Sequence, residues 1–178
     1  MIDGNRRLRL VQLFYQTGQL DRLTLIRERL AGATTAERPP LTVNDLLGEW
    51  RGEGVTLYPD GQTPDTYPTI FRVDKNGDSQ LVQQLTINQG VLTRNIKSTA
   101  RIEGSILYFG EGAQINQVLL LPDGASSTSP QQVRLRQAFF LEVGWLLNPG
   151  LRQRLIRRYN DKGEWSSLTL VTERKTQG

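Results

Sequence analysis

The sequence predicts an all-β protein: a closed antiparallel up-and-down β-barrel preceded by an additional β-hairpin. Three observations predict this class. Apolar and polar residues alternate with period two along most of the 178-residue chain, whereas helical periodicity is scarce. Turn residues such as Asn76-Gly77 and Asp161-Lys162-Gly163 separate the alternating runs at short intervals. The roughly nine or ten strands that result form a meander, and closing a meander into a barrel removes its exposed edges.

The chain divides into three predicted parts. Residues 1–30 read as a β-hairpin, residues 31–42 as a linker, and residues 43–178 as the barrel. The linker is assigned from AGATTAERPP, which is small, polar and ends in two prolines. A single helical turn is expected next, with Thr42 or Asn44 as its cap.

The barrel strands are assigned from alternating runs that end in turn residues. They are expected over residues 48–59, 66–74, 79–89, 91–104, 105–112, 114–122, 131–137, 138–147, 151–160 and 164–175. The stretch ASSTSP, residues 125–130, is polar and is expected to be a loop. Because the connections are short, neighbouring strands should run antiparallel.

Alternation also assigns the faces of the strands, because every second side chain points the same way. Three sets should share a face: Tyr67, Thr69, Phe71 and Val73; Leu81, Leu85 and Ile87; Ile96, Ala100 and Ile102. A small barrel fills its interior with side chains, and a slightly wider one holds a single ligand. If the barrel is hollow, we expect Tyr58, Phe71 and Tyr108 to line its cavity.

A repeat links the two ends of the chain. Residues 7–30 align without a gap to residues 152–175, at an offset of 145 (152 minus 7). The identical pairs are Arg7/Arg152, Arg9/Arg154, Leu10/Leu155, Gly18/Gly163, Leu23/Leu168, Thr24/Thr169, Leu25/Leu170, Glu28/Glu173 and Arg29/Arg174. The shared glycine register and the shared L-T-L-x-x-E-R ending favour duplication over convergent hairpin composition.

The repeat gives the N-terminal hairpin an interpretation. A hairpin alone is marginally stable in water, and a hairpin that closes one barrel should close another. Residues 1–30 are therefore expected to be the last two strands of a preceding barrel that this chain lacks. Two alternatives stay open: the hairpin packs on the outside of the single barrel, or it pairs with a second chain. We expect it outside the barrel that contains Trp50, and poorly packed unless a partner covers it.

The composition excludes several classes of function. The chain has no cysteine and no histidine, which excludes disulfides, thiol nucleophiles, Cys/His zinc sites and Ser-His-Asp triads. The net charge is +4, mostly from arginine, but no recognition helix, RNP-like motif or long basic run indicates nucleic-acid binding. No stretch approaches the roughly 20 apolar residues of a transmembrane helix. A soluble, cytoplasmic protein without a metal or a catalytic residue is expected.

The first barrel strand opens with Gly48-Glu49-Trp50, which resembles the G-x-W motif of the lipocalin and calycin barrels. The resemblance implies that the tryptophan plugs one end of the barrel and that a basic residue of the last strand stacks on it. Arg174 is the expected partner, and such a stack contributes about 1 kcal/mol. The implied role of Gly48, Trp50 and Arg174 is structural.

Longer stretches resemble a two-barrel family of cyanobacteria and chloroplasts. They are LLGEWRGEGVTLYPD, TYPTIFRV, FFLEVGWLLNPGLRQRLIRRYNDKGEWSSLTLVTERK and NRRLRLVQLF…LDRLTLIRERL. The plant members of this family are ATP synthase biogenesis factors, which assist assembly of the catalytic head. The resemblance covers the family's C-terminal barrel and the end of its N-terminal barrel. A weaker, fold-level resemblance to calycin-type bilin lyases implies a non-covalently bound bilin as the alternative.

Two patches are candidate partner surfaces. Trp145 and Leu146 belong to a run of three apolar residues, which cannot all point inward from one strand, so exposed apolar surface is expected. Arg152, Arg154 and Arg158 share a face by alternation and could dock an acidic partner surface or tetrapyrrole propionates. The alternative for these arginines is an ordinary solvated strand face.

These observations predict a non-enzymatic binding protein. The first hypothesis is an assembly factor with a filled barrel, a functional outer surface and ATP synthase head subunits as partners. The second is a lipocalin-like carrier of a bilin or another apolar small molecule, which requires a cavity. Self-association through the N-terminal hairpin is a further expectation.

Overall fold

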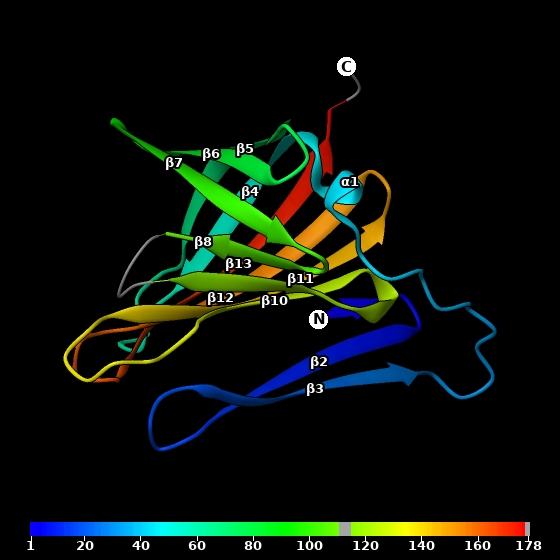
Figure 1. Ribbon diagram of the computed structural model, residues 1–178, viewed down its shortest axis with the longest axis horizontal. Helices are drawn as coiled ribbons and strands as arrows, with labels where there is room; N and C mark the ends of the chain where they lie inside the picture. Colours follow the sequence, from blue (N-terminus) through cyan, green and yellow to red (C-terminus); the bar gives the residue numbers. More distant parts are fainter. Residues whose placement is uncertain (111–114, 177–178) are drawn as a thin grey trace.

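The structure, a computed structural model, describes residues 1–110 and 115–176, which form a closed barrel with a small separate sheet beside it (Figure 1). The barrel strands are β4 (Gly48–Leu57), β5 (Asp65–Asn76), β6 (Gln80–Gln89), β7 (Leu92–Glu103), β8 (Ile106–Phe109), β9 (Asn116–Leu120), β10 (Ala125–Pro130), β11 (Phe139–Asn148), β12 (Leu151–Tyr159) and β13 (Trp165–Lys175). Each pairs antiparallel with its sequence neighbours, and β13 pairs with β4 to close the barrel. The predicted fold class is confirmed.

The N-terminal hairpin forms its own sheet of β1 (Ile2–Asp3), β2 (Arg6–Phe14) and β3 (Leu20–Arg29), outside the barrel. Its position outside the barrel agrees with the prediction. The expectation of poor packing is wrong for one face, because Leu8 is fully buried in an apolar cluster with Trp145 and two further barrel residues. The barrel itself therefore covers one face of the hairpin.

One end of the barrel is closed by α1 (Val43–Leu46). Thr42 caps this turn in a capping box: its backbone N–H and its hydroxyl both lie within hydrogen-bond distance of the Asp45 carboxylate, at 2.8 and 2.6 Å. The indole N–H of Trp50 donates to the carbonyl of Leu46 at 3.0 Å. The helical turn and the tryptophan together close this end of the barrel.

Strand register decides which side chains fill the barrel. It carries one inward-facing set across four strands, from Trp50 on β4 through Phe71 on β5 and Leu85 on β6 to Ile96 on β7. The faces predicted from alternation are therefore the inner faces, although Ile96 itself is 44% exposed. The buried apolar cluster consists of Leu41, Trp50, Phe71, Val73, Leu81, Ala100, Leu107, Phe109, Leu120 and Leu146.

The loop predicted over ASSTSP is instead β10, which pairs with β9 on one edge and β11 on the other. Ser127 and Ser129 on its outer side are fully buried, and the amide of Gln12 on β2 donates to the Ser127 hydroxyl at 2.9 Å. Small side chains let β2 approach closely. Serines give no hydrophobic alternation, so the sequence predicts a loop where the structure has this strand.

The strand predicted over residues 131–137 is a loop. It begins with an isolated bridge between Gln132 and Gln19, and Arg136 adopts a left-handed φ of 59°, which a strand does not allow. The alternating letters QQVRLRQ misled the assignment. The end of the strand predicted over 105–112 and the start of the one over 114–122 lie outside the described residues.

The helices of the described part of the chain are one turn long, and none of them could cross a membrane. The short η1 (Pro122–Gly124) leads from β9 into β10. It contains Asp123, whose left-handed φ of 60° directs the chain around a tight corner beneath the hairpin.

Candidate functional site

The middle of the barrel holds a buried ion cluster of Arg152 and Arg154 on β12, Glu173 on β13 and Glu142 on β11. Arg152 donates to Glu173 from Nε at 3.0 Å and from Nη2 at 2.7 Å. Arg154 donates to both oxygens of Glu173, at 3.1 and 2.9 Å, and to Glu142 at 3.3 Å. Two positive and two negative charges therefore neutralise each other where water is excluded.

Aromatic rings cover this ion cluster. The guanidinium carbon of Arg152 lies 4.5 Å from the centre of the Trp50 ring and 5.1 Å from that of Phe71, and Arg154 lies 4.9 Å from Phe71. Gly52 leaves the space that Glu173 needs: a Cβ there would lie 2.8 Å from Cα and Cγ of Glu173. These side chains fill the barrel between the Trp50 end and its middle.

The cluster shifts the pKa of Glu173. Burial alone would raise this pKa, but the charges of Arg154 and Arg152, and the hydrogen bonds from both, outweigh burial and lower it to about 2 from an ordinary 4.5. The carboxylate therefore stays ionised inside the barrel.

This pKa predicts how stability depends on pH. Because the pKa of Glu173 is lower in the folded state, its contribution is fully present above about pH 4.5 and is lost as pH falls towards 2. The shift corresponds to roughly 3 kcal/mol of unfolding free energy. Urea unfolding between pH 7 and pH 2.5 measures it, and Glu173→Gln should flatten that part of the profile. An unchanged profile in this variant would contradict the assignment.

The prediction that Arg174 stacks on Trp50 is wrong. Because Glu173 points inward, its neighbour Arg174 points outward and is exposed. The cations over the Trp50 ring are Arg152, at 4.5 Å, and Lys175, at 5.2 Å. Gly48 begins β4 with a φ of 105°, which favours glycine there.

The three residues expected to line a cavity do not lie together. Phe71 faces the interior but is covered by the arginines of the ion cluster. Tyr58 follows β4 and donates its hydroxyl to Asp65 at 2.8 Å, at the start of β5. Tyr108 is wrong as an interior residue: its neighbours Leu107 and Phe109 face inward, so its ring lies outside beneath Arg101, 5.1 Å away.

The candidate partner surfaces also need correction. Arg152 and Arg154 share a face, as predicted, but that face is the barrel interior, so neither is exposed to a partner. Arg158, on the same face, is exposed and lies 5.8 Å from the Phe140 ring. Leu146 is buried in the barrel core. The predicted docking surface of three arginines therefore does not form, because two of them pair with the buried Glu173 inside the barrel.

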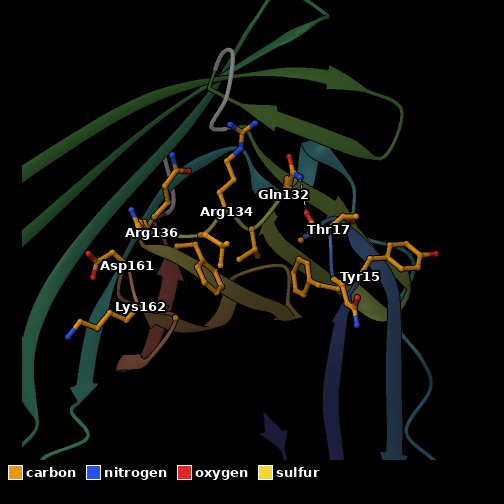
Figure 2. Close-up of a pocket in the computed structure, with 15 residues that line it drawn as sticks. Tyr15, Thr17, Gln132, Arg134, Arg136, Asp161 and Lys162 are labelled. Atoms are coloured by element: carbon orange, nitrogen blue, oxygen red, sulfur yellow. Dashed lines mark hydrogen bonds between the residues drawn. The ribbon is translucent and has the colours of Figure 1, made fainter.

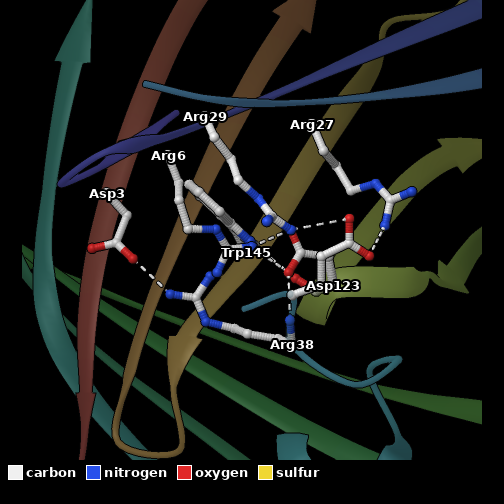
Figure 3. Close-up of polar contacts among 8 residues, drawn as sticks. Asp3, Arg6, Arg27, Arg29, Arg38, Asp123 and Trp145 are labelled. Carbon is white, nitrogen blue, oxygen red and sulfur yellow. Dashed lines mark hydrogen bonds and ion pairs between the residues drawn. The ribbon is translucent and has the colours of Figure 1, made fainter. Parts of the chain in front are cut away.

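Trp145 points out of the barrel, but the hairpin and the linker cover it, so it is not the exposed apolar surface expected from the sequence (Figure 3). Arg6 and Arg38 lie over its ring, at 5.4 and 5.2 Å, and its indole N–H donates to the Asp123 carbonyl at 3.0 Å. The Asp123 carboxylate binds the buried guanidinium of Arg6 and accepts from the backbone N–H of Arg38 at 2.8 Å. Arg38 also pairs with Asp3 at 2.6 Å. These contacts around Trp145 and Asp123 attach the hairpin to the barrel.

The turn of the hairpin is held at a second place. The backbone N–H of Val133 donates to the Gly18 carbonyl at 2.8 Å, and the Gln132 amide donates to the Thr17 carbonyl at 2.8 Å. A Cβ at Gly18 would lie 1.9 Å from the Val133 carbonyl oxygen, so only glycine permits this approach. The hairpin is therefore anchored both near Trp145 and at its turn.

A cleft of about 790 Å³ opens between the hairpin turn, the loop 132–137 and the turn 161–163 (Figure 2). Arg134, Arg136 and Lys162 outnumber the one acidic residue of its lining, Asp161, and Leu135 is 96% exposed. We call it the basic cleft. The sequence does not reveal this cleft, because the alternation in residues 131–137 predicts a strand there; the two arginines around a leucine are the available signal.

Among residues 1–110 and 115–176, no three acidic side chains come together in a way that could hold a metal ion. The basic cleft instead combines cations with apolar surface. Such a surface suits a ligand or protein segment that carries both carboxylates and apolar side chains.

Two family models match the chain. The model described as biogenesis factor required for ATP synthase 1, C-terminal domain, matches residues 37–176. The model described as domain of unknown function DUF3598, N-terminal, matches residues 1–33. No curated protein matches the chain.

Solved structures match as well. A protein of unknown function from the DUF3598 family of Nostoc punctiforme PCC 73102 is 55% identical, with a TM-score of 0.93, and the match covers 99% of this chain and 64% of that chain. This chain therefore spans less than two thirds of that relative. The S-type phycobiliprotein lyase CpeS from Guillardia theta matches with a TM-score of 0.61 at 13% identity, over 76% of this chain and 91% of that chain, which shows the barrel fold alone.

Proposed function

The chain belongs to the family of the biogenesis factor required for ATP synthase 1, and on that basis we propose that it is a non-enzymatic assembly factor. Its proposed partners are subunits of the catalytic head of an ATP synthase, met in the cytoplasm. It acts by binding these proteins and keeping their contact surfaces apart from wrong partners until assembly.

One observation carries this proposal: charged side chains fill the barrel between its Trp50 end and its middle. Arg152 and Arg154 satisfy Glu173 there and contact Trp50 and Phe71. A ligand could enter this space only by breaking a buried, neutral ion cluster, at a cost of several kcal/mol. This favours a function on the outer surface of the protein.

The basic cleft is the proposed contact surface. Arg134 and Arg136 supply guanidinium groups that bind carboxylates in bidentate geometry, and exposed Leu135 between them supplies an apolar anchor. Lys162 adds a third cation from the turn 161–163. The partner segment would present acidic side chains on either side of an apolar one.

A pull-down tests this proposal. The tagged chain should enrich ATP synthase head subunits from a cyanobacterial lysate, with the full-length Nostoc relative as positive control. The double substitution Arg134→Glu, Leu135→Asp should reduce the enrichment at least about tenfold, because it reverses a charge and removes the apolar anchor. The matched control, Arg94→Glu with Val91→Asp, changes exposed residues of the same types near the β6–β7 turn and should leave the enrichment unchanged. Failure of the wild-type chain to enrich these subunits would refute the proposal.

The carrier hypothesis is the weaker one, because the bilin lyase resembles this chain in fold alone. Titration of the purified protein with biliverdin separates the two hypotheses. We expect no change in the absorbance of the pigment, and a saturable spectral shift would favour the carrier.

A further inference from the structure

The barrel strand β7 is paired along only part of its second edge. On its first edge, β6 pairs with it from residue 92 to residue 101. On its second edge, β8 pairs with residues 100–103 alone. Among residues 1–110 and 115–176, no strand therefore pairs with this edge from residue 92 to residue 99, and Figure 1 shows β7 running past the end of β8. We call residues 92–99 of β7 the open edge.

Strand geometry decides which backbone groups of the open edge point away from β6. In an antiparallel pair, alternate residues direct both their N–H and their C=O to the partner strand, and the residues between them direct both the other way. The N–H of Ile102 donates to the Ser79 carbonyl at 2.8 Å, so the even-numbered residues of β7 bond to β6. Thr93, Asn95 and Lys97 therefore direct their N–H and C=O groups outward. These groups can form the hydrogen bonds of a further strand.

The side chains of the open edge also suit a further strand. Register places Leu92, Arg94 and Ile96 on the face that continues the barrel interior. Leu92 and Ile96 are 66% and 44% exposed, although they are apolar. Residues 92–99 contain no proline, and their pairing with β6 contains no bulge, so two features by which proteins block a free strand edge are absent there. A strand added at this edge would cover both apolar side chains.

The charge of the open edge determines what kind of segment fits it. Its charged residues are Arg94 and Lys97, and it has no acidic residue. The residues opposite them on β6, Ile87 and Gln84, are uncharged. A second copy of the chain would place the cations of both edges along one interface without a carboxylate, and like charges on adjacent strands repel each other. An acidic segment of another protein would instead neutralise them.

We infer that the open edge of β7 binds an extended acidic segment of a partner protein, which adds to the barrel as a strand in line with β8. The backbone of the segment bonds to the outward N–H and C=O groups of this edge. On the inner face, a carboxylate lies beside Arg94, and the apolar side chains on either side of it cover Leu92 and Ile96. The segment therefore has the pattern apolar, any residue, acidic, any residue, apolar.

The open edge is separate from the basic cleft, since no residue that lines the cleft belongs to β7. The two proposals can therefore fail independently. Arg94→Glu, one of the two changes in the control variant of the pull-down, should weaken binding at the open edge and leave the enrichment of head subunits unchanged. Arg134→Glu with Leu135→Asp should have the opposite effects.

Synthetic peptides test the inference. The peptide TVTETVTE has the proposed pattern, and TVTKTVTK has the same apolar residues with the charge reversed. We expect the acidic peptide to bind with a Kd below about 100 µM, measured by fluorescence anisotropy, and the basic peptide to bind at least about tenfold more weakly. Arg94→Glu should remove this preference. The matched control is Arg157→Glu, which changes an exposed arginine on a strand that is paired on both edges and should leave the preference unchanged.

Amide hydrogen exchange distinguishes the addition of a strand from electrostatic attraction alone. With the acidic peptide bound, exchange should slow more at the outward N–H groups of Thr93, Asn95 and Lys97 than at those of Arg94 and Ile96, which already bond to β6. Asn95→Pro removes one outward N–H without removing a hydrogen bond to β6, and it should weaken binding about tenfold. Thermal unfolding shows whether each variant is folded.

Three outcomes would overturn the inference. The first is that neither peptide binds to the wild-type chain. The second is equal binding of the two peptides, or protection that does not alternate along the open edge. The third is a dimer of the chain alone, detected by sedimentation and abolished by Asn95→Pro, since the occupant of the edge would then be a second copy.

Discussion

Replacing Glu173 by glutamine is expected to lower the free energy of unfolding by about 3–5 kcal/mol. Glu173 is fully buried and is the shared acceptor for Arg152 and Arg154, so its loss leaves two arginines without their main countercharge inside the barrel. Arg154 would keep Glu142 as a countercharge, but this hydrogen bond is long, at 3.3 Å. Urea unfolding at pH 7, followed by tryptophan fluorescence, measures the change.

The chain supplies its own control for this prediction. Glu28 makes the same contacts with Arg7 and Arg9 on the exposed face of the hairpin, so Glu28→Gln removes the same interactions where water can replace them. We expect little measurable change in stability for this variant. Equal destabilisation by the two substitutions would show that burial does not distinguish the two clusters, against this account.

The second large effect is expected for Trp145→Ala, which should lower the free energy of unfolding by about 3–5 kcal/mol. The ring is buried, and the two guanidinium groups of Arg6 and Arg38 lie over it. Its removal should loosen the hairpin before the barrel unfolds, because Leu8 packs on the same cluster. Hydrogen exchange of residues 6–14 should therefore accelerate more than exchange in the barrel strands.

Two variants sharpen this test. Trp165→Ala removes a partly exposed tryptophan of β13 and should cost less than about 1 kcal/mol. Trp145→Phe keeps an aromatic ring in contact with Arg6 and Arg38 but loses the indole N–H bond to the Asp123 carbonyl. Its cost should therefore lie between those of Trp145→Ala and Trp165→Ala. If exchange accelerates equally in the barrel and the hairpin, Trp145 does not hold the hairpin independently of the barrel, and the prediction is wrong.

The barrel itself was predictable from the sequence. Period-two alternation in β4 to β7 fixed which side chains face inward, and turn residues such as Asn76-Gly77 marked the hairpins. The position of the N-terminal hairpin outside the barrel followed from the offset repeat. These features depend on local pattern and on self-similarity, which one sequence contains.

The direction in which charged residues face was not predictable in the same way. Alternation placed Arg152 and Arg154 on one face correctly, but hydropathy assigns arginine to solvent, and only pairing with Glu173 across β12 and β13 makes the interior acceptable. The same strand register turns Arg174 to the outside of the barrel, whereas the sequence predicts that it stacks on Trp50 inside. A pairing partner on another strand is long-range information that a local pattern does not carry.

The candidate site was not predicted. The sequence places Trp145 on an exposed partner surface, whereas the hairpin of the same chain covers it. The basic cleft was missed because QQVRLRQ alternates like a strand, while Arg136 takes a left-handed turn and Gln132 bridges to the hairpin. Tertiary contact with the hairpin turn overrides the local preference.

The most direct test of the central claim, that the protein binds its partner through the basic cleft, is a hydrogen-exchange footprint with a purified cyanobacterial ATP synthase head. We expect slower exchange in residues 132–137 and 161–163 and at the hairpin turn when the head is added, and no such protection in the Arg134→Glu, Leu135→Asp variant. Unchanged exchange in these segments, or protection confined to the rim of the barrel near Tyr58, would contradict it.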